Sequence, residues 1–212
     1  MKLIIPNLYQ FTIEHPKRNC TTHQYLLLCK DPILISTGTK KQAEIILPII
    51  KKILNNKELK YIFVSNIESD KCGGLSLFLK EYPNVTTICS STGKRELYNY
   101  GYCGTTISKE DQDTLIGDDY FFKFINYPSE VHLKNGLLFY EEKRNIFFSI
   151  DLMGRIGCNI NHLLRSSWYC EINSINLKNI PNYDELEKLQ NKLKKIHPKI
   201  IAVGHGYCIH CI

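Results

Sequence analysis

Short apolar and β-branched segments, each bounded by turn residues, recur along nearly the whole chain. Three of them follow one another near the N-terminus and predict a meander of strands: Leu8 to Ile13, Gln24 to Cys29 and Ile33 to Ser36. Because a strand must bury its apolar face against another layer, such segments fold only as packed sheets. The pattern restricts the chain to a fold built on β-sheets.

Helical periodicity appears between the strand patterns. Lys40 to Leu54 carries apolar residues on one helical face, although Pro48 is expected to bend or interrupt the helix. A second amphipathic helix is predicted from Asp184 to Ile196, and a shorter one from about Leu75 to Glu81. Strands that alternate with helices predict a mixed α/β fold.

Further strand patterns fill much of the remaining chain: Tyr61 to Ser65, Val85 to Cys89, Leu115 to Gly117, Tyr120 to Ile125, Gly136 to Tyr140, Asn145 to Ile150 and Ile200 to Val203. No low-complexity linker divides the sequence, and both halves run from strands to a helix. We therefore expect two similar lobes packed in a single domain over residues 1–212.

The composition argues against several functional classes. The 27 Lys and Arg residues exceed the 21 Asp and Glu residues by only six, without a block of like charges, so no nucleic-acid partner is expected. No apolar stretch approaches the roughly 20 residues that span a bilayer, so no membrane association is expected either. The apolar start is too short for a signal peptide. Nine cysteines, an odd number, then favour reduced thiols and a cytoplasmic location.

Two local motifs have alternative interpretations. Cys208-Ile-His-Cys211 has the spacing of half a zinc site, but it lacks a matching second pair, so reduced thiols on a frayed end are favoured. The stretch from Tyr98 to Tyr102 is either an interaction surface or a packed helix end with its loop, and the second is favoured. Lys194 and Lys195 are expected on a solvated helix face.

Polar residues suited to metal binding follow several predicted strands. They are Asn66-Ile-Glu68-Ser-Asp70-Lys71, His132, Asp151 and His205, the last between two glycines. Residues at strand ends are brought together at one edge of a sheet. Carboxylates and imidazole there can bind a metal, but isolated Asp and His residues at strand ends are more often capping or hydrogen-bonding groups. Their spacing alone leaves both interpretations open.

In five segments the sequence resembles the metallo-β-lactamase superfamily. Within it, the chain is most similar to the diiron domain of flavodiiron proteins and to stand-alone oxygen-binding diiron proteins. The segments are Thr21 to Gly38, Asn66 to Gly74, His132 to Tyr140, Phe148 to Asp151 and Gly204-His205-Gly206. The resemblance covers about Leu8 to Tyr207 and implies a four-layer αββα sandwich, without a flavodoxin domain.

The same resemblance implies a set of metal ligands. Glu68, His132 and Asp151 correspond to ligands of a first iron, while Asp70, Asp151 and His205 correspond to ligands of a second iron that Asp151 bridges. No flavin or nicotinamide site is recognised, because no Gly-x-Gly-x-x-Gly motif follows a strand.

Two of the family's histidines are replaced. Asn66 stands at a first-site position, where its carbonyl oxygen can still face a hard cation. Lys71 stands at a second-site position, where a charged ammonium cannot ligate. Three carboxylates and Lys71 sum to a formal charge of −2, which a single divalent ion neutralises. We therefore expect one iron ion at most, or none, with Lys71 salt-bridged to Asp70 in place of the second metal.

Three functions are compatible with this site. The first is a non-haem iron protein that binds dioxygen or another small redox ligand, signals to a protein partner and needs an external electron donor for any oxidoreductase turnover. The second is a metal-free pseudoenzyme that serves as a binding or signalling module. Hydrolysis by a metal-activated water is disfavoured, because Glu68 replaces the histidine that such sites need. A homodimer is an open expectation for any of the three.

Overall fold

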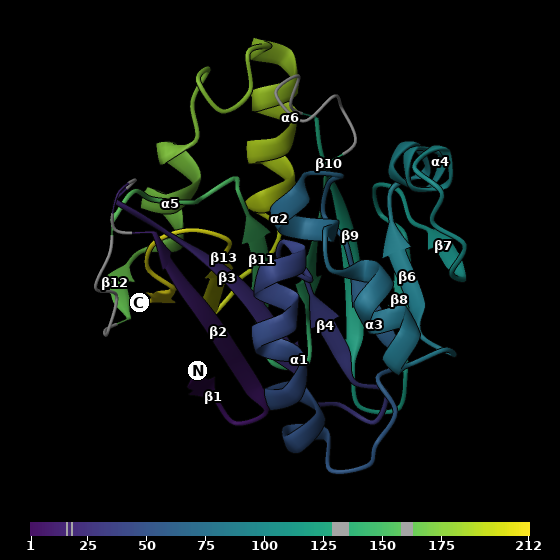
Figure 1. Cartoon of the computed structure of the whole chain (residues 1–212). Coiled ribbons are helices and arrows are strands. Elements are labelled where there is room, and N and C mark those ends of the chain that lie inside the picture. The colour runs from purple at the N-terminus through teal and green to yellow at the C-terminus, as the bar shows by residue number, and fades with distance from the viewer. Residues whose placement is uncertain (16, 18, 129–135, 158–162) are drawn as a thin grey trace. The chain divides into compact units, whose positions relative to one another are not determined.

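The structure is a computed structural model of the whole chain, and it describes residues 1–15, 17, 19–128, 136–157 and 163–212 (Figure 1). The chain divides into two compact units. Unit 1 comprises residues 1–13, 22–109 and 117–119, and unit 2 comprises residues 14–21, 110–116 and 120–212.

The first sheet has seven strands in sequence order, β1 to β7. They are β1 (Lys2–Ile5), β2 (Leu8–His15), β3 (Cys20–Leu27), β4 (Ile33–Ile35), β5 (Tyr61–Phe63), β6 (Thr86–Cys89) and β7 (Thr106–Ser108). β4 pairs with β3 in antiparallel fashion, whereas β4, β5, β6 and β7 are parallel. The carboxyl ends of these four strands therefore lie at one edge of the sheet.

Helices connect the parallel strands of unit 1. They are α1 (Lys40–Leu54), α2 (Ser69–Cys72), α3 (Leu75–Glu81) and α4 (Ser91–Asn99). In Figure 1, α1 and α3 lie side by side, and their apolar faces join strand residues in one buried cluster. Its members include Leu26, Leu34, Ala43, Ile46, Ile50, Ile62, Val64, Leu75 and Phe78. Burial of this face stabilises the helices more than their intrinsic propensity does.

The second sheet also has seven strands, in the order β12-β14-β13-β11-β10-β9-β8. They are β8 (Thr114–Ile116), β9 (Phe121–Tyr127), β10 (Gly136–Glu141), β11 (Ile146–Ile150), β12 (Leu164–Ser166), β13 (Ile200–Val203) and β14 (Ile209–Cys211). Unit 2 also contains α5 (Trp168–Ser174) and α6 (Tyr183–Leu193). β11 and β13 are parallel neighbours, so their carboxyl ends meet.

The strand and helix patterns predict most of this architecture. The helix from Lys40 to Leu54 is confirmed, but Pro48 does not interrupt it, because the proline lies on the exposed side of a helix anchored by its apolar face. The last long helix ends at Leu193 rather than Ile196. Mixed α/β structure with two multi-stranded sheets is confirmed.

Several short elements escape prediction. The segment expected to be a polar loop after Asn66 contains the helical turn α2, and α4, α5, β7, β12 and β14 carry too few apolar residues to show a period. The expected frayed C-terminal end is wrong, because Cys208 is buried and β14 pairs with β12 and β13. Tyr98 and Tyr100 at the end of α4 are exposed, whereas the Tyr102 hydroxyl is hydrogen-bonded to Thr87.

No helix among the described residues combines the length and the apolar character that crossing a membrane requires.

Candidate metal centre

The predicted site residues lie at the carboxyl ends of parallel strands in both units. In unit 1, Asn66 follows β5 and begins the segment that carries Glu68, Asp70 and Lys71. In unit 2, Asp151 follows β11 directly and His205 follows β13, its parallel neighbour. His132, the remaining candidate, lies outside the described residues. The two groups are described separately below.

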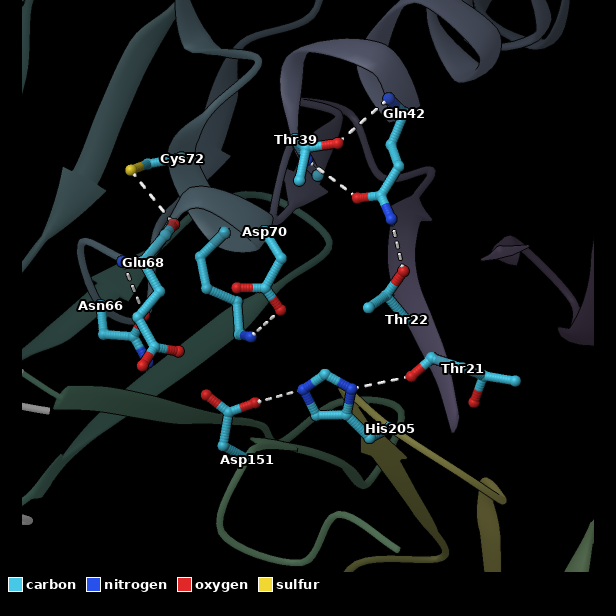
Figure 2. A network of polar contacts seen from close by, with 12 residues as sticks. Thr21, Thr22, Thr39, Gln42, Asn66, Glu68, Asp70, Cys72, Asp151 and His205 are labelled. Carbon is cyan, nitrogen blue, oxygen red and sulfur yellow. Dashed lines mark hydrogen bonds and ion pairs between the residues drawn. The ribbon is translucent and has the colours of Figure 1, made fainter. Parts of the chain in front are cut away.

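Asn66 shapes the start of the unit 1 segment. Its side chain is buried, and its Oδ1 accepts a hydrogen bond from the Glu68 backbone N–H at 3.1 Å (Figure 2). A side-chain carbonyl that binds the backbone two residues later forms a local turn, which leads the chain into α2. Glu68 is the N-cap residue of α2, yet its exposed carboxylate makes no capping hydrogen bond. The Glu68 carboxylate therefore does not cap the helix.

Lys71 forms the central ion pair of unit 1. Its Nζ lies 2.5 Å from Oδ2 of Asp70, and the two side chains are 3% and 22% exposed. The predicted Lys71–Asp70 salt bridge is thus present. Burial of an ammonium is costly unless a carboxylate compensates its charge, so Lys71 holds Asp70 in this geometry.

Two glycines allow α2 to pack tightly against the turn that follows β4. A Cβ atom at Gly74 would lie 3.1 Å from the Thr37 carbonyl oxygen and 2.4 Å from the Ala43 Cβ of α1, and one at Gly73 would lie 3.1 Å from the Thr39 Cα. The Thr37 backbone N–H donates to the Lys71 carbonyl at 2.8 Å. Lys71 is therefore fixed by its backbone as well as by its ion pair.

Cys72 is the remaining candidate ligand in unit 1. Burial raises the pKa of the Cys72 thiol to about 11, with the Asp70 carboxylate adding to the effect. The Sγ atom also lies 3.3 Å from the Glu68 carbonyl oxygen, to which it donates. Because the thiolate is the metal ligand, these features argue against the partly buried Cys72 as a metal ligand.

Alkylation tests this assignment. At pH 8 a pKa of about 11 leaves roughly 100-fold less thiolate than an ordinary thiol has. We expect iodoacetamide to modify Cys72 at least about 50-fold more slowly than the exposed Cys103, with the rate rising steeply toward pH 11. Peptide mass spectrometry gives both rates from one sample. Equal rates at pH 8 would show that Cys72 is an accessible, activated thiol.

The backbone of unit 2 is distorted next to Asp151. Ile150 has a φ of +48°, which is rare for a β-branched residue, and the pairing of β11 with β13 shifts register there. The Gly204 N–H donates to the Ile150 carbonyl at 2.7 Å, and a Cβ at Gly204 would lie 3.2 Å from Oδ1 of Asp151. This conformation costs on the order of 1–3 kcal/mol and turns Asp151 toward the loop that carries His205.

The hydrogen bonds of His205 define its protonation pattern. Nδ1 lies 2.7 Å from the Thr21 carbonyl oxygen, which can only accept, so Nδ1 carries the proton (Figure 2). In a neutral ring Nε2 then presents a lone pair, 3.0 Å from Oδ1 of Asp151. Two acceptors at this distance require positive charge between them, either a proton on Nε2 or a cation bound by both groups. Asp151 and His205 therefore suit a metal ion.

Sequence reasoning missed two residues that position His205. The Thr21 hydroxyl accepts a hydrogen bond from the Gly206 N–H at 2.9 Å, and the Arg155 N–H donates to the His205 carbonyl at 3.1 Å. The Arg155 guanidinium is anchored by both carboxylate oxygens of the buried Glu171, at 2.7 and 2.8 Å. The sequence carries no signal for the Arg155–Glu171 pair, because the partners are sixteen positions apart on irregular chain and a short helix.

Within the described part of the chain, no three His, Cys, Asp or Glu side chains form a metal-binding group. The described donor residues form two separate groups, one in each unit. In unit 2, Asp151 and His205 converge, and in unit 1 an ammonium accompanies Asp70. The group in unit 1 does not fit a cation at Asp70, whereas the group in unit 2 fits one.

Comparison with known proteins places this geometry in context. Residues 20–206 match the family described as ODP family beta lactamase. The flavodiiron protein of Giardia intestinalis has a similar structure, with a TM-score of 0.80 and 19% sequence identity over 98% of this chain and 55% of that chain. The likeness shows the metallo-β-lactamase-like fold of flavodiiron cores.

Two proteins with similar sequences are named differently, one as a flavoprotein and the other as a hydrolase. Diflavin flavoprotein A 2 of a Nostoc species is 25% identical over 209 residues, which are 93% of this chain and 35% of that protein. A probable hydroxyacylglutathione hydrolase of Schizosaccharomyces pombe is 25% identical over 201 residues, 89% of this chain and 74% of that protein. The chain thus spans about a third of the length of the flavoproteins it matches first.

Proposed function

Because the chain belongs to the ODP family of beta-lactamase domains, we propose that it is a flavodiiron-like core with an altered metal site. It binds one iron ion at most and responds to dioxygen or another small redox ligand. The observation that carries the proposal is the ion pair of Lys71 with Asp70, which brings an ammonium to one proposed ligand of the second iron.

The charges support a single ion. Glu68, Asp70 and Asp151 carry three negative charges, and Lys71 removes one of them. One divalent cation neutralises the remaining two charges, whereas a second cation would leave the site positive. In this proposal Glu68, His132 and Asp151 hold the iron, and Asn66 acts through the turn that presents Glu68.

Residues of the chain also fix the orientation of His205, which corresponds to a ligand of the second iron and faces the shared ligand Asp151. Thr21 and Arg155 orient His205, and the lone pair of its Nε2 faces Asp151. Iron at such a site supplies one-electron redox chemistry and an open coordination position for a small ligand. Repeated turnover requires electrons from outside, so we propose an electron-transfer or signalling protein partner, a cytoplasmic location and a homodimer as the assembly to test.

Two other functions are kept as outcomes of the test. A metal-free binding or signalling module is favoured by the replacement of two histidines by Asn66 and Lys71. Hydrolysis is favoured by the similarity to the hydroxyacylglutathione hydrolase, but Glu68 stands against it, because it replaces a histidine of the hydrolytic site.

Metal analysis with an oxygen titration tests the proposal. We expect protein purified without oxygen and loaded with ferrous iron to hold about one ion per chain or slightly less. Its near-ultraviolet and visible absorption should change on exposure to oxygen. Glu68→Gln should lower the iron content at least about tenfold at limiting iron, whereas Asp184→Asn, on the exposed start of α6, should leave it unchanged.

The alternatives give different results in the same preparations. No retained iron at any concentration would replace the iron proposal by the metal-free module. Zinc-dependent cleavage of thioesters that Glu68→Gln abolishes would replace it by the hydrolase.

A further inference from the structure

A groove in unit 2 lies apart from the residues of the candidate metal centre. It is bordered by β8, β9 and the C-terminal end of α6, and it has a volume of about 350 Å³. The lining residues are Asp111, Gln112, Thr114, Lys123, Phe124, Ile125, Lys192, Lys195 and Ile196. This volume is at the lower end of the range for small-molecule sites.

The floor of the groove is apolar. Ile125 is 7% exposed, and Ile196 follows the end of α6 as a partly buried residue. Beyond the paired residues Thr114 and Lys123, Ile116 of the neighbouring strand β8 is 64% exposed and pairs with Phe121 of β9. An elongated apolar group can therefore cover Ile125 and Ile196 in the groove and extend past Thr114 toward Ile116.

The rim of the groove is cationic. Three lysines and one aspartate line it, a formal charge of +2. Lys192 is paired with Asp111 at 2.7 Å, and Lys123 is paired with Glu142 at 2.6 Å. The lysine side chains in these pairs are 39% and 42% exposed, so the pairs are weak and can exchange for another anion. Lys195 makes no side-chain ion pair among the described residues.

The turn before β8 is held in an unfavourable conformation at the groove. Gln112 has a φ of +68°, and its N–H donates to the Phe124 carbonyl at 3.0 Å. Asp113 accepts a hydrogen bond from the Glu110 N–H with its carboxylate and ties the turn together. This side of the groove is thus fixed in place by the fold.

We propose that the groove binds an anionic amphiphile, a carboxylate on an unbranched apolar chain such as a medium-chain fatty acid. The carboxylate pairs with Lys195 and Lys123, and the chain lies over Ile125 and Ile196 toward Ile116. The charge of the rim selects against cationic amphiphiles, and the floor selects against carboxylates without an apolar chain.

Titration of the isotope-labelled full chain with decanoate, followed by backbone amide shifts, tests this proposal. We expect saturable shifts at Gln112, Ile125 and Ile196. Each methylene added from octanoate to decanoate should tighten binding by up to about fourfold, the limit for a fully buried methylene. Acetate and decyltrimethylammonium should cause no saturable shift at these residues.

Variants separate a specific site from general attraction to lysines. Lys195→Ala should raise the dissociation constant of decanoate about threefold, and its combination with Lys123→Ala about tenfold. Lys194→Ala is the matched control, because it removes the same charge from the adjacent position, where Nζ contacts Asn191 outside the groove. An equal loss in Lys194→Ala, equal binding of decyltrimethylammonium, or shifts confined to other residues would overturn the proposal.

Discussion

Lys71→His is expected to raise the iron content from at most one ion to about two ions per chain. The substitution removes the ammonium that now lies 2.5 Å from Asp70 and adds an imidazole ligand at the same position. Asp70 is then no longer paired with an ammonium, and the formal charge of the proposed site falls from −2 to −3. Both changes favour a second divalent cation.

Elemental analysis of parent and variant, purified together without oxygen from iron-supplemented cells, measures this effect. Lys71→Met is the control, because it removes the charge without adding a ligand, and we expect it to stay close to one ion. Iron-loaded Lys71→His should also melt at a higher temperature than its metal-free form, since a ligand bound only by the folded state stabilises it. Equal iron contents in parent and Lys71→His would contradict the assignment of Lys71 to the second-metal position.

Phe139→Ala is expected to lower the free energy of unfolding by about 3–5 kcal/mol, the usual cost of removing a fully buried phenylalanine. Phe139 of β10 is fully buried, and its ring stacks on Phe148 with centroids 4.5 Å apart. It also meets Phe122 edge-on at 5.0 Å. Because Phe148 lies on β11 just before Ile150 and Asp151, the cavity removes support from the strand that presents Asp151.

Urea unfolding followed by circular dichroism gives this free energy. The matched control is Phe121→Ala on the neighbouring strand β9, where the ring is partly exposed and contacts the Lys123 ammonium. We expect a loss of less than about 1.5 kcal/mol there. Equal losses for the two variants would mean that the aromatic cluster of the second sheet does not form a close-packed core.

Local patterns were sufficient for the regular elements. The helix from Lys40 to Leu54 agrees with its predicted bounds, because its apolar face repeats over fifteen residues; the structure adds a capping box at Thr39. Short elements such as α2 and β14 were missed, since three or four residues show no period. Pro48 was expected to break a helix that burial of Ile46 and Ile50 keeps intact.

The sequence by itself determined the mixed α/β class, most of the longer strands and helices along the chain, and the residue types of the proposed metal site, including the unusual Asn66 and Lys71. It also predicted the Lys71–Asp70 pair, because the resemblance puts Lys71 at the second-metal position, where its charge needs a carboxylate as a partner. These features depend on local periodicity and on charge, which can be recognised from residues close together in the sequence.

Only the tertiary structure determined how the side chains and backbone groups of the site are oriented. It revealed the left-handed Ile150, the Thr21 carbonyl that assigns the proton of His205, and the Arg155–Glu171 clamp. Thr21 and His205 are 184 positions apart, so no local pattern can relate them. Their contact exists because two strand ends far apart in the sequence meet in the folded unit, and that meeting sets the direction in which His205 presents its remaining lone pair.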